Sequence, residues 1–256
     1  MTNAVETRRN RIADIVSRNG FSNVLDLAEI LSVTPATIRT DLRALEERGL
    51  VKRSHGGALM VSREVTDLPE DVKGRINVGL KKRIASKAVQ LIENNDTIII
   101  ASGSTMVTFA ENIIPEGKLN VVTPSIRIAM KLLGNDDISV LQLGGRIYGN
   151  TLSTRGEYAE SGLELLHCTK LFFGVEGFDM TSGLTCATLE EAALTRKMMQ
   201  SATKSIVLAD STKFCRRGFG RICRLSAIDM LITDDGLPQE AIRQIEDDGV
   251  QVIIAD

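Results

Sequence analysis

The sequence lacks the features that mark a zinc site, a membrane span or a secretory signal. Its four cysteines include no CxxC pair, and it has only two histidines, His55 and His167. No apolar run approaches the roughly 20 residues that cross a bilayer. Residues 1–10 are polar, without a hydrophobic signal core. We therefore expect a cytoplasmic protein with no metal, no cofactor and no membrane partner, and with thiols that are buried or idle.

A large charge imbalance is missing as well. The 256 residues contain 31 Lys and Arg against 33 Asp and Glu, a net charge of −2. Residues 1–60 nevertheless carry a net +2, which leaves −4 for the rest of the chain. A small basic part joined to an acidic body favours a local contact with DNA and keeps the body away from it.

The most informative stretch is residues 23–57, which predicts a helix, a tight turn, a second helix and a β-wing. Thr34 can cap the second helix, and Pro35 can take its first position, where no amide hydrogen bond is lost. An apolar stripe at helical spacing must then be buried: Ile38, Leu42 and Leu45. Gly49 is expected to end this helix.

The opposite side of the second helix carries small, hydroxyl and arginine side chains, which can approach bases and phosphates. The contacts with DNA predicted for it are Ala36, Thr37, Arg39, Thr40 and Arg43. Residues 50–59 are expected to form the wing, which adds Lys52, Arg53 and His55 to the predicted contacts. The alternative is an ordinary amphipathic helix pair with a charged hairpin that contacts another protein.

A further helix is expected over residues 8–18, with Ile12, Ile15 and Val16 turned inward. Its arginines 8, 9 and 11 either touch the DNA backbone or are solvated, and the sequence leaves both interpretations open.

Residues 33–42, with Leu45, Gly49 and the segment 53–58, resemble the N-terminal domain of DeoR-family transcriptional regulators. The resemblance implies a winged helix-turn-helix whose second helix enters the major groove of double-stranded DNA. Thr40 departs from the family, in which many members carry a second basic residue after the arginine, so the resemblance does not give the operator sequence.

Residues 61–78 are charged and lose periodicity, which predicts a linker between a DNA-binding domain over 1–60 and a larger domain over 79–256. Strands are expected at 97–101, 121–123, 139–143, 170–175, 205–208, 230–233 and 250–254. Helices are expected at 80–92, 106–112, 126–133, 157–166, 190–202 and 239–246. This alternation predicts an α/β fold with a doubly wound parallel sheet, which binds ligands at the carboxyl ends of its strands.

The first candidate ligand loop is at such a strand end. Ser102, Gly103, Ser104 and Thr105 follow the strand over 97–101 and precede a helix, whose free amides can cradle a phosphate. The alternative is a tight turn in which Ser104 or Thr105 only caps the helix.

Three more strand-end loops carry glycine, carboxylate or lysine. Asp210 and Lys213 follow one strand, and the lysine could complete a phosphate pocket. Two other loops have the glycine content that close ligand approach needs. Their candidate residues are Gly144, Gly145, Gly174 and Glu176.

These loops, with Lys81, Gly156, Gly183 and Glu191, resemble the sensor domain of the DeoR family. That domain is similar in fold to sugar-phosphate isomerases and CoA transferases, and members typically respond to phosphorylated sugars. The resemblance implies that residues 102–105 and Lys213 hold the phosphate. Ala101 and Pro124 stand where an aspartate and an asparagine are common, which removes hydrogen-bond partners for the sugar hydroxyls.

We therefore predict a DNA-binding regulator, a repressor of a carbohydrate-utilisation operon. Its expected partners are double-stranded DNA, a phosphorylated sugar and further copies of itself. One alternative is an isomerase-like enzyme with an appended DNA-binding module, in which Asp179, Glu191 or Asp210 would supply the base. Another is a DNA-binding oligomer whose larger domain answers to no effector.

Overall fold

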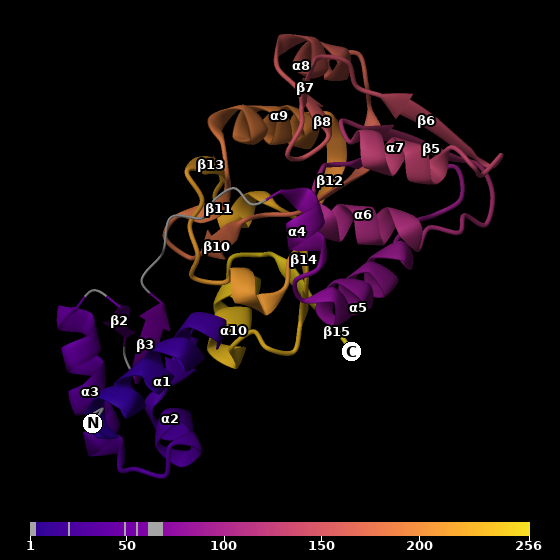
Figure 1. Ribbon diagram of the computed structural model, residues 1–256. Helices are drawn as coiled ribbons and strands as arrows, with labels where there is room; N and C mark the ends of the chain where they lie inside the picture. The colour runs from indigo at the N-terminus through magenta and orange to yellow at the C-terminus, as the bar shows by residue number, and fades with distance from the viewer. Residues whose placement is uncertain (1–3, 20, 49, 55, 61–68) are drawn as a thin grey trace.

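The computed structural model describes residues 4–19, 21–48, 50–54, 56–60 and 69–256 (Figure 1). Its N-terminal part contains α1 (Ala4–Asn19), β1 (Phe21–Asn23), α2 (Val24–Ile30), α3 (Pro35–Glu47), β2 (Val51–Ser54) and β3 (Gly57–Met60). The three helices share one apolar core, and the strands form a sheet in the order β1-β3-β2. This arrangement is the predicted winged helix-turn-helix.

Helix α3 begins where the sequence predicts because its first turn is capped. Thr34 Oγ1 accepts a hydrogen bond from the amide of Thr37 at 3.2 Å. The predicted stripe is almost wholly buried: Ile38, Leu42 and Leu45. It packs with residues of α1 and α2, so the opposite side of α3 is left to solvent. Gly49 lies outside the described residues.

The wing is the hairpin of β2 and β3, as predicted. The sequence does not reveal β1, which pairs antiparallel with β3 through Phe21 opposite Leu59 and Ser22 opposite Ala58. Three residues are too few to show the alternation that marks a strand.

Helix α4 (Glu70–Gly74) lies within the stretch predicted as a linker. The amide of Glu70 donates to the carbonyl of Asn150 at 2.9 Å, and the helix packs against α6 (Ser104–Glu111), as Figure 1 shows. A single isolated turn is not stable in water, so these long-range contacts stabilise it. Helix α5 (Val78–Val89) follows, and it begins at the last residue of the predicted linker.

The larger part is built on a seven-stranded parallel sheet in the order β15-β14-β12-β9-β4-β5-β6. Each of the seven predicted strands belongs to it: β4 (Thr97–Ile100), β5 (Leu119–Thr123), β6 (Ile138–Gln142), β9 (Cys168–Phe173), β12 (Ala202–Leu208), β14 (Met230–Asp234) and β15 (Gln251–Ala255). The chain moves outward from β4 through β5 and β6, and then returns to the other side of β4 with β9. The predicted doubly wound fold is confirmed, and β4 and β9 flank its switch point.

Helices cover both faces of the sheet. Helices α5, α6 and α7 (Ile126–Leu132) pack on one face, and α8 (Glu157–Leu163), α9 (Leu189–Gln200) and α10 (Gln239–Asp247) pack on the other. Successive residues of β4 alternate between these layers: Ile98 and Ile100 join the first and Ile99 the second. Burial on both faces explains why this strand is apolar throughout.

Shorter elements that the sequence does not reveal surround the sheet. They are the hairpin β7 (Arg146–Tyr148) with β8 (Ser153–Arg155), the sheet of β10 (Gly177–Asp179), β11 (Gly183–Cys186) and β13 (Gly220–Cys223), and the 3₁₀ turns η1 (Ser211–Lys213) and η2 (Leu225–Ala227). In the described part of the chain, no helix has the length and apolar character needed to cross a membrane.

Candidate DNA interface and effector site

The outward side of α3 presents the residues predicted to meet DNA. Ala36, Arg39, Thr40 and Arg43 are exposed, and Thr37 is half-buried. Thr40 Oγ1 donates to the carbonyl of Ala36 at 3.1 Å, so the hydrogen of its hydroxyl group is already used within the helix. Within the described residues, the side chains of Arg39 and Arg43 make no hydrogen bond or ion pair. Both guanidinium groups are therefore available to phosphate or base.

The inward side of α3 carries a buried carboxylate that the sequence analysis did not single out. Asp41 is 2% exposed, and it accepts hydrogen bonds from Arg8 Nε at 2.6 Å and Arg9 Nε at 2.9 Å. Burial opposes its charge, but these two arginines hold the pKa of Asp41 below its ordinary value. Arg8 and Arg9 thus tie α1 to α3, whereas Arg11 is exposed. The helical spacing of Asp41 from Ile38 was the signal for its burial.

The wing is tied to α3 through Arg53. Its Nε lies 2.6 Å from Glu46 Oε2, and its backbone amide donates to the other oxygen of Glu46 at 2.8 Å. Arg53 therefore anchors the wing to the helix, besides being exposed. His55 and the side chain of Lys52 lie outside what the structure describes.

The loop of residues 102–105 joins β4 to α6, at the switch point of the sheet. Gly103 has φ +127°, which an L side chain rarely adopts, and a Cβ there would face open space. Gly103 is also the N-cap of α6 and supplies no side-chain cap, so Ser104 and Thr105 do not fill the capping role. Its amide donates to Glu70 Oε2 at 3.1 Å. The first turn of α6 therefore already faces an anion.

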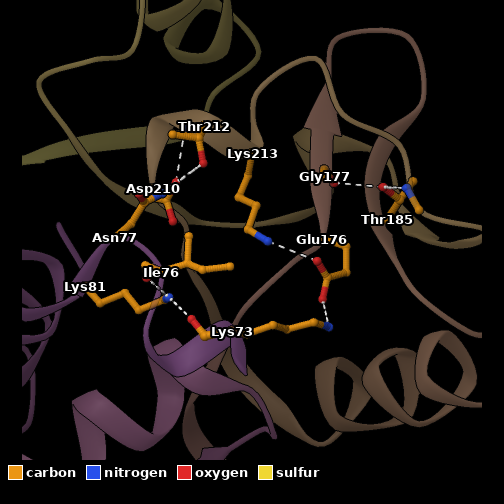
Figure 2. Close-up of polar contacts among 11 residues, drawn as sticks. Lys73, Ile76, Asn77, Lys81, Glu176, Gly177, Thr185, Asp210, Thr212 and Lys213 are labelled. Atoms are coloured by element: carbon orange, nitrogen blue, oxygen red, sulfur yellow. Dashed lines mark hydrogen bonds and ion pairs between the residues drawn. The ribbon is translucent and has the colours of Figure 1, made fainter. Parts of the chain in front are cut away.

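Two lysines contact the carboxylate of Glu176, which follows β9, and a third lysine contacts the backbone of one of them (Figure 2). Lys213 Nζ lies 3.0 Å from Glu176 Oε2, and Lys73 pairs with Oε1. Lys81, which is 5% exposed, donates to the carbonyl of Lys73 at 2.6 Å and to that of Ile76. Burial opposes the charge on Glu176, but Lys213 and Lys73 outweigh it and hold its pKa below the ordinary value. Burial lowers the pKa of Lys81.

Asp210 fixes the turn that carries Lys213. Its Oδ1 accepts hydrogen bonds from the amide of Thr212 at 3.1 Å and from Asn77 Nδ2 at 3.2 Å. Asn77 Nδ2 also donates to Thr212 Oγ1 at 3.2 Å. Asp210 is 2% exposed and caps η1, which positions Lys213 toward Glu176 as Figure 2 shows.

The remaining predicted ligand residues are distributed around this edge of the sheet. Gly174 precedes the Glu176 loop, and Glu191 Oε2 lies 3.9 Å from Arg155 Nη2 at the start of α9. Gly145 has φ +122°, and a Cβ there would lie 2.7 Å from the carbonyl oxygen of Arg155, so this glycine allows the close approach of β8. Gly144 is exposed beside it.

Four residues of the site were missed by sequence reasoning. They are Glu70, Lys73, Asn77 and Arg127. The first three lie in the predicted linker, which had no periodic pattern. Arg127 lies at the start of α7, just after β5, so its strand-end position was a usable signal.

The two departures from the family pattern in the larger domain are both buried. Ala101 is 5% exposed, and its amide donates to the carbonyl of Phe172 at 2.9 Å. The carbonyl of Pro124 accepts from the amide of Thr154 at 2.9 Å. At these positions the protein contributes packing and backbone contacts, in place of the polar side chains common in the family.

The site is thus able to bind an anion rather than a cation. Its lysines, Arg127 and the free amides of α6 all favour negative charge. Within the described residues, no group of three or more His, Cys, Asp or Glu side chains could hold a metal ion.

Comparison with known proteins finds two family models that match this chain. Residues 8–64 match the DeoR-like helix-turn-helix domain, and residues 76–235 match the DeoR C terminal sensor domain. The chain is 35% identical over 249 residues to the HTH-type transcriptional regulator GlpR of Haloferax volcanii, covering 96% of both proteins. It is 28% identical over 248 residues to the glycerol-3-phosphate regulon repressor of Escherichia coli K12, covering 96% of this chain and 97% of that protein.

Among solved structures, ribose 5-phosphate isomerase A from Methanocaldococcus jannaschii is similar over 54% of this chain and 55% of its own, with 17% identity and a TM-score of 0.40. The two matched domains together cover α2, α3, the wing and the candidate ligand loops described above. The chain is therefore a DNA-binding transcriptional regulator that belongs to the DeoR family.

Proposed function

We propose that this regulator represses a carbohydrate-utilisation operon in the cytoplasm and is controlled by a phosphorylated sugar. The phosphate would bind between the loop of residues 102–105 and Lys213, at the carboxyl ends of β4 and β12. Glu176, Asp210 and Asn77 would meet the sugar hydroxyls, because carboxylates and amides accept or donate to them.

The observation that carries this proposal is the position of the cluster. The loop of residues 102–105, hereafter the glycine loop, follows β4, whereas Glu176 follows β9 and Lys213 follows β12. These three strands are neighbours in the sheet. The switch point between β4 and β9 is where sheets of this kind bind ligands. A relative whose name is glycerol-3-phosphate regulon repressor supports a small phosphorylated effector.

The outward side of α3 would bind in the major groove, with the wing against the adjacent backbone. Met130 of α7, Leu133 directly after it and Leu141 of edge strand β6 are 71%, 69% and 49% exposed. A second copy could cover this apolar surface. A homo-oligomer would space two or more α3 helices, so the operator would contain repeated half-sites.

We propose regulation rather than catalysis for the sensor domain. The carboxylates that could serve as a base are already engaged. Asp179 accepts from Arg217 at 2.7 Å, and Asp210 accepts from the amide of Thr212 at 3.1 Å. Glu191 Oε2 lies 3.9 Å from Arg155 Nη2. Incubation with pentose and hexose phosphates tests this, because turnover above the uncatalysed rate would show an enzyme.

Thermal unfolding with a panel of sugar phosphates, each beside its unphosphorylated sugar, tests the effector. A ligand that binds the native state raises the Tm. We expect at least one phosphorylated sugar to raise the Tm and to change the affinity for promoter DNA, while its unphosphorylated form does neither. Unchanged Tm with every sugar phosphate, together with intact DNA binding, would refute the proposed effector class.

A further inference from the structure

Glu70 presents its carboxylate to the glycine loop from α4, which packs against α6. Its Oε2 accepts the hydrogen bond from the amide of Gly103 at 3.1 Å. Its own amide is fixed by the carbonyl of Asn150 at 2.9 Å. The residue is only 3% exposed, although it lies in a charged segment of the sequence. A carboxylate of the protein thus lies where the free amides of α6 would receive a phosphate.

The carboxylate of Glu70 and the neighbouring guanidinium group of Arg127 each leave one buried polar atom without a hydrogen bond within the described residues. Oε1 of Glu70 lies 3.4 Å from Arg127 Nε, and both atoms are buried without a hydrogen bond to any described residue. Burial raises the pKa of Glu70, against the opposing effects of Arg127, the Gly103 amide and Lys73. A phosphate brings three acceptor oxygens and more charge than one carboxylate, so it can satisfy both the α6 amides and Arg127.

We infer that Glu70 is an internal ligand of the glycine loop, which occupies the place of the effector's phosphate and must be displaced when the effector binds. The inference rests on the proposed function for the identity of the site. It adds that, in the ligand-free protein, the carboxylate of Glu70 occupies the phosphate site. This competition lowers the apparent affinity for every phosphorylated ligand.

Contacts of α4 connect the displacement of Glu70 to the DNA-binding domain. Lys73 lies on the same short helix and pairs with Glu176, and its carbonyl accepts from Lys81. Helix α4 therefore bridges the glycine loop and the lysine cluster. We expect a ligand that expels Glu70 to shift α4. The chain runs from α4 back through residues 61–68 to the wing, and α1 lies against η1, which carries Lys213. A ligand that contacts the two positions of α4 differently can therefore shift the affinity for DNA.

Isothermal titration with inorganic phosphate at fixed ionic strength tests the competition. The proteins are wild type, Glu70→Gln, and Asp71→Asn as a control on the exposed side of the same helix. We expect Glu70→Gln to bind phosphate about tenfold more tightly, because its competitor has lost its charge. Asp71→Asn should bind as wild type does. Glu70→Ala, compared at equal folded fraction by its Tm, should shift in the same direction.

Phosphate binding that is equal in wild type and Glu70→Gln, or weaker in the variant, would overturn the inference and leave the proposed function intact. Failure of all these proteins to bind phosphate, together with failure of the sugar phosphates, would overturn both. The affinity for promoter DNA tests the coupling between the phosphate site and DNA binding. Without phosphate, Glu70→Gln should bind promoter DNA with the affinity that wild type shows when saturated with phosphate, within about twofold. A variant that keeps the ligand-free affinity of the wild type would refute the coupling.

Discussion

The ammonium group of Lys213 lies 3.0 Å from a carboxylate oxygen of Glu176, although the two residues are separated by 37 positions in the chain. The contact joins the loops that follow β12 and β9, beside the glycine loop that follows β4. Lys73 of α4 holds the other oxygen of the same carboxylate. The cations that we assign to the effector are therefore already oriented by a fixed partner, which reduces the cost of ordering them when a ligand binds.

Replacement of Lys213 separates ligand response from DNA binding. Lys213→Ala should abolish the change in DNA affinity that a sugar phosphate causes, because a phosphate loses its cation at this end of the site. The affinity for DNA without ligand should stay within about twofold of wild type. Fluorescence anisotropy with labelled promoter DNA measures both, and Lys82→Ala, an exposed lysine of α5, is the control. A full ligand response in Lys213→Ala would remove this lysine from the site.

Replacement of Arg43 probes the exposed side of α3. Arg43→Ala should weaken binding to DNA by about 1–3 kcal/mol if the arginine meets a base, and relax preference at that position. If it meets a phosphate, the slope of log affinity against log salt should fall by about one. Titrations at several salt concentrations distinguish these results, with Arg243→Ala of α10 as the control. Affinity and slope both equal to wild type would exclude Arg43 from the interface.

The buried carboxylate of α3 should stabilise the DNA-binding domain. Asp41→Asn should lower the free energy of unfolding by about 1–3 kcal/mol, since it leaves Arg8 and Arg9 without their charged partner. The native pKa of Asp41 is lowered, so this stabilisation is present above the unfolded pKa of about 3.9 and is lost as the pH falls through the native pKa.

Urea unfolding at a series of pH values measures this effect. The difference between wild type and Asp41→Asn should be constant near pH 7 and shrink below about pH 4. Glu29→Gln, an exposed neighbour on α2, should show no such pattern. A difference that grows on acidification would contradict the assignment of the ion pairs.

The thiols should be unreactive in the folded protein. Burial raises the pKa of Cys215 to about 12 and that of Cys223 to about 11, and it also raises the pKa values of Cys168 and Cys186. At pH 8 only about a thousandth of Cys223 would be thiolate. Labelling with a chromogenic disulfide should be slow in native protein and reach four equivalents after denaturation. Rapid native labelling would contradict the burial of these side chains.

The sequence predicts the sheet well because its central strands are buried on both faces. A run such as residues 97–101 is then apolar without interruption, and the turn residues after it mark the strand end. The sequence also predicts α3 well, because Thr34 caps its first turn and its apolar residues recur at helical spacing. Once the strand order is known, the glycine loop, Glu176 and Lys213 all lie at the carboxyl ends of the neighbouring strands β4, β9 and β12.

The parts that the sequence hides are those held by contacts between distant segments. Helix α4 has five residues and no apolar stripe, so Glu70 and Lys73 looked like linker charges, and only their partners Gly103 and Glu176 reveal their roles. The ion pairs of Asp41 are similar, because their partners are 33 and 32 positions away. Local pattern shows where a side chain points, but not what it meets.

The most direct test of the account is the affinity of the intact protein for double-stranded DNA from the region upstream of its own gene. Anisotropy titrations at low and moderate salt, with unrelated duplex as competitor, measure specific binding. We expect the affinity for the promoter fragment to fall steeply with salt and to exceed the affinity for unrelated duplex by about a thousandfold or more. We also expect this affinity to change when a sugar phosphate is added. Equal and weak binding to the promoter fragment and to the unrelated duplex at low salt would contradict the assignment of this protein as a DNA-binding regulator.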